Sequence, residues 1–188
     1  IYGMEAYMIN DIPQVYREKF EDEYIVFDLE TTGFNPGTCG ITEIGAVRLL
    51  KGEIADTFST FVNPGCHISR QITDMTGITD EMVADAPSIP EALAMFKEYI
   101  GDKHLAAHNS PFDMGFLYKH GKDCGISFDN DCLDTIWLFR RWLPGRKSYS
   151  LGKLAADLNI PLRHHRALDD AMCTAKIMQI CMEKAAHP

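Results

Sequence analysis

The chain has 188 residues, 46% of them hydrophobic, and a formal net charge of -9 at neutral pH. This length predicts one domain with a full hydrophobic core, and no apolar run reaches the roughly 18 residues that a membrane-spanning helix needs. The negative charge argues against strong nucleic-acid binding by charge alone. The six cysteines include no CxxC pair and no zinc-ligand spacing, and no signal peptide is recognisable, so we expect reduced thiols in a cytoplasmic protein.

The first predicted elements are three strands. Residues 24–27 form an apolar run that is typical of a buried strand, and we expect this strand at residues 24–29. Residues 41–50 and 54–62 predict two more strands. Residues 69–84 then predict short helices that are broken at Gly77.

The rest of the chain is predicted to be mostly helical. Apolar residues at helical spacing indicate a helix at residues 88–100, and residues 104–107 predict one short buried strand. Strands that come first, followed by helices that alternate with a strand, predict an α/β fold with a mixed sheet covered by helices. The remaining helices are predicted at residues 110–121, 133–142, 150–158 and 167–186.

Two acidic residues follow the first apolar run. Asp28 and Glu30 are two residues apart, so on a strand they share a face, and we expect both at the end of that strand, before a turn at Gly33. Two close carboxylates repel each other unless a cation lies between them. Carboxylates on rigid elements are how proteins hold Mg²⁺, so the pair predicts a metal site.

A third acid, Asp113, has two interpretations. Ser110-x-x-Asp113, with Pro111 at the first helical position, resembles a capping box that starts a helix, and this alone would explain the acid. The same helix start could aim the carboxylate into a cleft. The two interpretations are compatible.

The last predicted helix begins with two adjacent acids, Asp169 and Asp170. Asp170 shares a helix face with Thr174 and Ile177, which should pack inward. We expect Asp169 to face solvent and to favour the helix N-terminus electrostatically.

These acids, in this order, resemble the motifs of the DEDD exonuclease superfamily. Asp28 and Glu30 match its first motif, Asp113 its second and Asp170 its third. One branch of the superfamily has a Tyr four residues before the last Asp, and the other has a His five residues before it. Arg166 and His165 occupy these positions, so the chain resembles the His branch over residues 24–183.

The resemblance implies a ribonuclease H-like fold and a 3′–5′ exonuclease that releases nucleoside monophosphates. It also implies two Mg²⁺ or Mn²⁺ ions. By analogy Asp28 bridges both ions, Glu30 and Asp170 complete the site at one of them, and Asp113 reaches through water. His165 is the expected general base, because a free imidazole can take a proton from water at neutral pH.

Substrate contacts are also expected by analogy. Thr31 would lie near the terminal 3′-hydroxyl, and Ile78 belongs to a segment expected to pack against the terminal base. Phe112, His108 and Asn109, at the second motif, are further candidates. His108 can instead be supporting structure, and Phe116, one helical turn after Phe112, is better explained as core.

The start of the chain carries a second resemblance. Ile1 to Tyr7 is similar to the sequence just before the exonuclease insert of PolC-type DNA polymerase III, which interrupts a PHP domain. The chain begins with Ile rather than Met. We therefore interpret residues 1–23 as a lead-in from a flanking PHP domain and residues 24–188 as an exonuclease domain. The expected partners are the single-stranded 3′ end of DNA and the rest of a replicative polymerase, for proofreading.

Several alternatives remain. An RNA 3′-end trimming nuclease similar to ribonuclease T has the same motifs. A non-catalytic module that binds nucleic acid or a clamp should have lost an acid or the His, and a phosphatase needs Asp-x-Asp where this chain has Asp28-Leu29-Glu30. A basic stretch could meet phosphates or be solvated surface, and it contains Arg140, Arg141, Arg146, Lys147, Lys153, Arg163 and Arg166.

Overall fold

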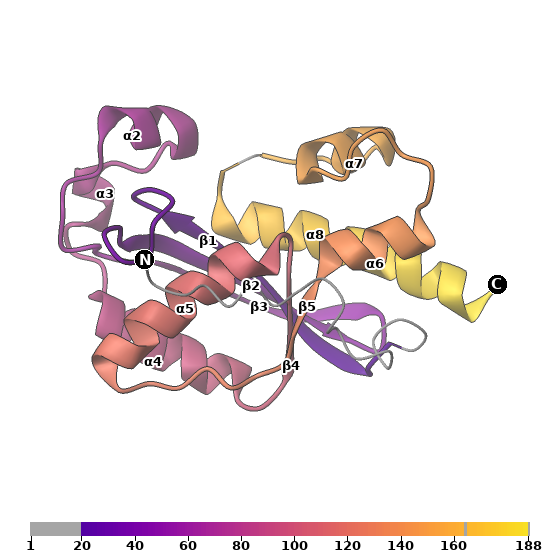
Figure 1. The fold of residues 1–188 in the computed structure, drawn as a ribbon, viewed down its shortest axis with the longest axis horizontal. Coiled ribbons are helices and arrows are strands. Elements are labelled where there is room, and N and C mark those ends of the chain that lie inside the picture. The colour runs from indigo at the N-terminus through magenta and orange to yellow at the C-terminus, as the bar shows by residue number, and fades with distance from the viewer. Residues whose placement is uncertain (1–19, 164, 188) are drawn as a thin grey trace.

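The computed structural model describes residues 20–163 and 165–187. Predictions for residues 1–19 and for His164 therefore lie outside the described residues. A five-stranded sheet in the order β3-β2-β1-β4-β5 forms the centre of the molecule (Figure 1). Its strands are β1 (Glu23–Thr31), β2 (Ile41–Leu50), β3 (Glu53–Phe61), β4 (His104–Ala107) and β5 (Cys132–Asp134).

The sheet is mixed, as predicted. β1 pairs antiparallel with β2, and β2 pairs antiparallel with β3. On its other side β1 pairs parallel with β4, which pairs parallel with β5. β1 is thus a central strand, and its side chains pack into an apolar cluster on each face of the sheet, which explains the apolar run in its sequence.

Helices lie on both sides of the sheet (Figure 1). One side carries α4 (Ile89–Ile100) and α5 (Ser110–Cys124), and the other carries three helices. Two short helices form a separate small cluster near one end of the sheet. The three helices are α6 (Thr135–Trp142), α7 (Leu151–Asp157) and α8 (Ala167–Ala186), and the short pair is α2 (Arg70–Thr76) and α3 (Asp80–Val83).

The alternation of side chains along β1 decides where the acids point. Ile25 and Phe27 belong to the apolar cluster that includes α4 and α5, whereas Tyr24 and Val26 belong to the cluster that includes α6, α7 and α8. Because strand side chains alternate, the next even positions continue toward α8. These positions are Asp28 and Glu30.

The α/β fold class and its helices are confirmed, with three local corrections. β1 continues to Thr31, two residues beyond the predicted strand, so both acids lie within its last four residues. Cys132–Asp134 forms an edge strand, and the helix predicted from residue 133 begins at Thr135 instead, because Asp134 caps it by accepting a hydrogen bond from the Ile136 N–H. Helix α5 continues to Cys124 and ends at a left-handed Gly125. Within the described residues no helix is both long and apolar enough to cross a membrane.

Candidate active site

Four carboxylates converge where β1 meets the first turns of two helices. Asp28 and Glu30 come from β1, Asp113 from the first turn of α5, and Asp170 from the first turn of α8. Glu30, Asp113 and Asp170 are only 7%, 3% and 8% exposed, and Asp28 is half-buried. Gathering several buried acids is costly unless a cation lies among them, so their convergence indicates a ligand site.

His165 joins this cluster from the residues just before α8. Glu30, His165 and Asp170 each offer one potential ligand atom, and these three atoms lie within 4.8 Å of one another. The His165 N–H also donates a hydrogen bond to Asp170 Oδ2, at 3.1 Å. The imidazole is exposed and its residue has a left-handed φ of 66°. Carboxylate oxygens with one imidazole are a donor set that fits a hard or borderline divalent cation.

The carboxylates raise one another's proton affinity. Burial, and then the negative charge of neighbours including Asp170, raises the pKa of Glu30 to about 8. Burial raises the pKa of Asp113 to about 8. The pKa of Asp28 is raised well above its usual value, first by burial and next by the charge of Asp113. A bound cation would reverse these shifts by favouring the charged forms.

The capping-box interpretation of Asp113 is wrong. The N-cap of α5 is Asn109, in a left-handed conformation with φ of 68°, and Ser110 already lies inside the helix. Asp113 Oδ1 instead accepts a hydrogen bond from the Leu29 N–H at 3.1 Å. The carboxylate therefore ties the start of α5 to β1, beside Asp28.

The two acids in the first turn of α8 differ in burial. Asp170 is buried toward the sheet, whereas Asp169 is half-buried. The inward orientation expected of Asp170 is confirmed by this burial. Because Asp169 is not fully exposed, the prediction that it faces solvent holds only in part.

Glu43 and Arg166 form an interaction that the sequence interpretation missed. Glu43 lies on β2 directly opposite Glu30 and is 1% exposed. Its carboxylate accepts hydrogen bonds from Arg166 Nη2 at 2.9 Å and from Arg166 Nε at 3.1 Å. An acid in the middle of an apolar strand was the available signal, because such a residue requires a buried partner.

The predicted substrate residues occupy different environments. The Thr31 side chain is buried and donates a hydrogen bond to the Gly33 carbonyl at 2.7 Å. Phe112 is half-buried, and its ring lies between those of Phe34 and Phe116. Phe116 is fully buried, in agreement with its assignment to the core.

His108 and Asn109 support the start of α5. His108 Nδ1 lies 3.0 Å from Thr135 Oγ1, and its ring stacks on Phe139. Burial lowers the pKa of His108 to about 4, so it is neutral near pH 7. The Asn109 N–H donates to Asp134 Oδ1 at 3.3 Å. Their contact with substrate stays a prediction.

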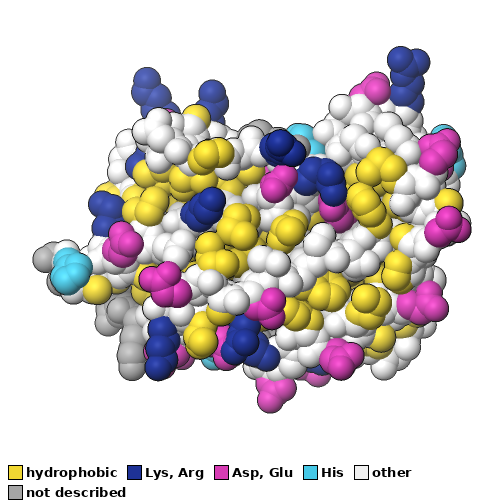
Figure 2. Space-filling model, turned by 180° about the vertical axis from the view of Figure 1, so that it is seen from behind, with side chains coloured by type: hydrophobic (Ala, Val, Ile, Leu, Met, Phe, Trp, Pro, Cys, Tyr) yellow, Lys and Arg dark blue, Asp and Glu magenta, His cyan; other side chains and the backbone are white. Residues whose placement is uncertain are grey.

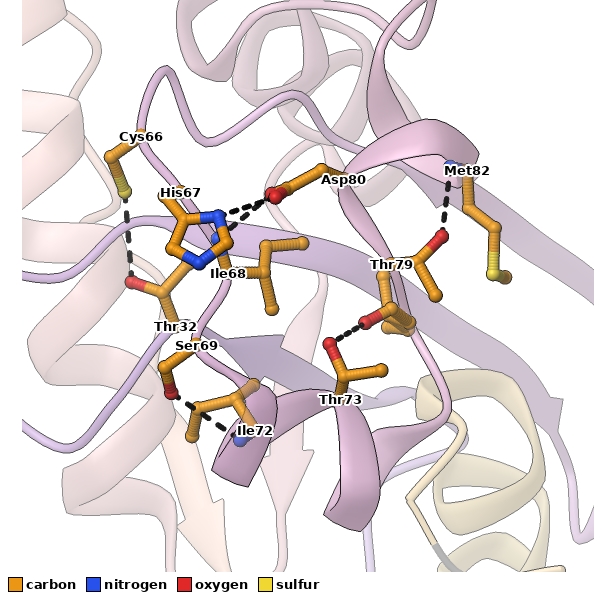
Figure 3. Close-up of polar contacts among 11 residues, drawn as sticks. Thr32, Cys66, His67, Ile68, Ser69, Ile72, Thr73, Thr79, Asp80 and Met82 are labelled. Atoms are coloured by element: carbon orange, nitrogen blue, oxygen red, sulfur yellow. Dashed lines mark hydrogen bonds and ion pairs between the residues drawn. The ribbon is translucent and has the colours of Figure 1, made fainter.

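Ile78 lies in the small cluster formed by α2 and α3. Its side chain is fully buried, and its carbonyl accepts a hydrogen bond from Thr73 Oγ1 at 2.8 Å. Figure 3 shows how polar contacts hold this segment: Asp80 Oδ1 accepts from the Ile68 N–H at 2.8 Å, and the Thr79 side chain caps α3. A contact between Ile78 and a terminal base stays a prediction.

The basic stretch is partly engaged within the protein. Arg146 pairs with Asp157 at 2.9 Å, Arg140 lies over the Trp137 ring, and Arg166 binds Glu43. Seen from behind, Lys and Arg side chains are interspersed with acidic ones (Figure 2). Phosphate contacts by this stretch stay a prediction.

Three comparisons place this geometry among known proteins. The family model described as Exonuclease matches residues 25–178. A PolC-type DNA polymerase III of Clostridium perfringens (strain 13 / Type A) is 46% identical over 189 residues, which cover 98% of this chain and 13% of that protein. Exonuclease X, solved in complex with 5′ overhanging duplex DNA, is 31% identical with a TM-score of 0.70, over 88% of this chain and 93% of that chain.

A second solved structure adds evidence for the fold. The nuclease domain of 3′hExo, a DEDDh family member bound to rAMP, has a TM-score of 0.77 at 22% identity, over 89% of this chain and 94% of that chain. The five-stranded mixed sheet with its helices is therefore the ribonuclease H-like fold that the sequence predicted. The match over residues 25–178, together with the similarity to Exonuclease X, shows that the chain belongs to the exonuclease family.

Proposed function

We propose that this domain is a metal-dependent 3′–5′ exonuclease that hydrolyses DNA from its 3′ end and releases nucleoside monophosphates. The observation that carries the proposal is the convergence of Glu30, His165 and Asp170, whose ligand atoms lie within 4.8 Å of one another. Asp28 and Asp113 complete the cluster of acids, and burial raises the pKa values of both.

The donor set fits two Mg²⁺ or Mn²⁺ ions. Asp28, Glu30, Asp113 and Asp170 would hold them. Such ions would lower the pKa of a water nucleophile and stabilise negative charge on the phosphate and on the leaving oxygen. The chain's own contribution is the fixed placement of these carboxylates by β1, α5 and α8.

His165 is the proposed general base. Its exposed imidazole can take the proton from an attacking water and release it to solvent. Its backbone N–H donates a hydrogen bond to Asp170 Oδ2, which holds the residue close to the acids. Thr31, Ile78, Phe112, His108 and Asn109 are the proposed substrate contacts.

Proofreading within a PolC-type DNA polymerase III is the proposed context. The similarity to the Clostridium perfringens protein supports it, although this chain spans only 13% of that relative's length. The proposed partners are a single-stranded DNA 3′ end and the rest of the polymerase chain, in the cytoplasm. We propose residues 24–188 as the exonuclease domain and residues 1–23 as part of a flanking PHP domain.

RNA 3′-end trimming is the second candidate. The structural neighbour 3′hExo was solved with rAMP bound, which gives this alternative a specific observation. A non-catalytic binding module is less well supported, because all four acids and the His are present.

A primer-degradation assay tests the proposal. A 5′-labelled DNA primer with a 3′ mismatch should shorten one nucleotide at a time with Mg²⁺ or Mn²⁺, and chelator should stop it. An RNA oligonucleotide of the same sequence should be degraded more slowly. Faster degradation of the RNA would favour trimming, and no degradation of either strand would refute the nuclease proposal.

A further inference from the structure

We infer that Glu43 is a positioning residue that holds the first turn of α8, and with it Asp170 and His165, against β1. We call Glu43, Arg166 and the Ala167 N–H the Glu43 clamp. This role rests on the proposed nuclease function, because what the clamp orients are two of its catalytic groups.

The contacts of the clamp span strand and helix. Besides its bonds to Arg166, Glu43 Oε2 accepts a hydrogen bond from the Ala167 N–H at 3.0 Å. Ala167 is the first residue of α8. Its N–H has no carbonyl acceptor within the helix, as is general for the first turn. Because Arg166 is the N-cap of α8 and its carbonyl accepts from the Asp170 N–H at 3.0 Å, the clamp is one helical turn from Asp170.

Gly45 shows how closely the helix approaches the strand. It is two residues from Glu43 and therefore shares its face of β2. A Cβ atom at Gly45 would lie 2.1 Å from the Leu168 backbone nitrogen, so no side chain fits there. The backbone of α8 thus rests on β2 at Gly45, and Glu43 fixes its start beside that contact.

The position of Glu43 argues against a purely stabilising role. It faces Glu30 across the β1–β2 ladder, and like charges directly opposite each other destabilise a sheet. A buried ion pair is weak evidence for stability, because desolvation offsets the attraction. What the buried carboxylate does supply is several directional contacts that set the angle and depth of α8.

The expected effect of breaking the clamp follows from this geometry. Residues that orient a metal ligand typically affect metal affinity or activity by about 10–100-fold. A shift of about 1 Å at reacting groups can cost about 10²-fold in rate. Without the Glu43 charge, Arg166 loses its carboxylate partner and keeps its contact with the Phe61 ring, and α8 loses its anchor.

The main test replaces Glu43 by Gln and uses Glu23→Gln as a matched control. Glu23 also pairs with an arginine across β1 and β2, at 2.6 Å from Arg48, but at the other end of these strands. Glu43→Gln should lower kcat on a DNA primer by about 10–100-fold and weaken Mn²⁺ binding by a similar factor. The KM for DNA should change little, and Glu23→Gln should match the parent in kcat, KM and Mn²⁺ affinity.

Two further measurements separate positioning from stability. Hydrogen exchange of the metal-free protein should be faster at the Ala167 and Asp170 amides in Glu43→Gln than in Glu23→Gln. The double variant Glu43→Gln with Arg166→Gln should be less impaired than the two single losses predict, because no unpaired charge remains.

The outcomes are distinguishable from failure of the proposed function. An inactive parent would refute the nuclease proposal itself. An active parent with Glu43→Gln equal to Glu23→Gln in kcat and Mn²⁺ affinity would overturn the clamp, even if its Tm fell. If Glu43→Gln does not fold, Glu43→Asp decides. Its carboxylate is too short to reach Arg166 and Ala167 together, so parent-like kcat and Mn²⁺ affinity in that variant would also overturn the inference.

Discussion

The two ends of the β1–β2 pair differ in the balance of positive and negative side chains. At one end Glu23 and Arg48 form a half-exposed ion pair, at 2.6 Å. At the other end Glu30 faces Glu43, and the nearby Arg166 is bound to Glu43. The first arrangement is neutral and the second leaves acids unneutralised. Acids gathered in this way reduce stability, so the contrast indicates that the second end is shaped for a cationic ligand.

Removing Asp28 should have the largest effect on activity and on metal binding. Asp28→Ala should reduce exonuclease activity to background and weaken Mn²⁺ binding, because a proposed ligand of the ions is lost. The fold should survive, and the Tm in chelator should rise, since one member of a self-repelling cluster is gone. Primer degradation, calorimetric titration with Mn²⁺ and thermal melting measure the three effects.

Glu23→Ala is the control for this variant, because it removes an acid from the same strand. It should keep full activity. Retained exonuclease activity in Asp28→Ala would show that the cluster is not the catalytic metal site.

Removing His165 should have a smaller effect. A general base typically contributes about 10²- to 10⁴-fold in rate, so His165→Ala should be slow rather than inactive and should still bind Mn²⁺. Single-turnover rates on a DNA primer measure the loss. His164→Ala is the neighbouring control, and an equal or larger loss in that variant would count against His165 as the base.

The acids near Glu30 should also make the stability of the protein depend on pH. The pKa values of Glu30 and Asp113 are about 8 in the folded, metal-free protein. In the unfolded chain they should be roughly 4. Between these values the folded state binds more protons, so the free energy of unfolding should fall as pH rises from about 4 to about 8. Urea denaturation in chelator at several pH values measures this slope.

Two comparisons sharpen the pH prediction. Glu30→Gln should flatten the slope, whereas Glu23→Gln should leave it unchanged. Saturating Mn²⁺ should also flatten it, since a cation favours the charged carboxylates. A metal-free protein that gains stability between pH 5 and pH 8 would contradict the raised pKa values.

The smallest effect is expected at the end of the β1–β2 pair that holds Glu23 and Arg48. Arg48→Gln should cost about 0.2–1 kcal/mol in the free energy of unfolding, as is usual for partly exposed ion pairs. Activity and Mn²⁺ affinity should not change. Denaturation in water and in about 1 M salt would show whether the loss is electrostatic, because at that salt concentration exposed charges are largely screened.

The sequence was most informative where a local pattern had one physical explanation. The apolar run before Asp28 could only be a buried strand, and its alternation placed Glu30 beside Asp28. The periodic face of α8 selected Asp170 over Asp169, in agreement with their burial. The general α/β architecture followed from the order of such elements.

The sequence was least informative about contacts between distant residues. Glu43 and Arg166 are 123 positions apart, and nothing local indicates that they meet. The strand Cys132–Asp134 has three residues, too few to show a period. Asp113 matched a local capping pattern, but its carboxylate bonds to Leu29 on another element, because tertiary contact outweighed local preference.

The shared position of β1 has a consequence for folding. Its odd residues belong to the cluster with α4 and α5, and its even residues to the cluster with α6, α7 and α8. Neither layer can therefore come apart without exposing a surface of the same strand, so we expect the two layers to unfold as one cooperative unit. Asp113 comes from one layer and Asp170 from the other. A partly folded chain, such as one still being synthesised, would lack a complete set of ligands and could not cut the nucleic acid around it.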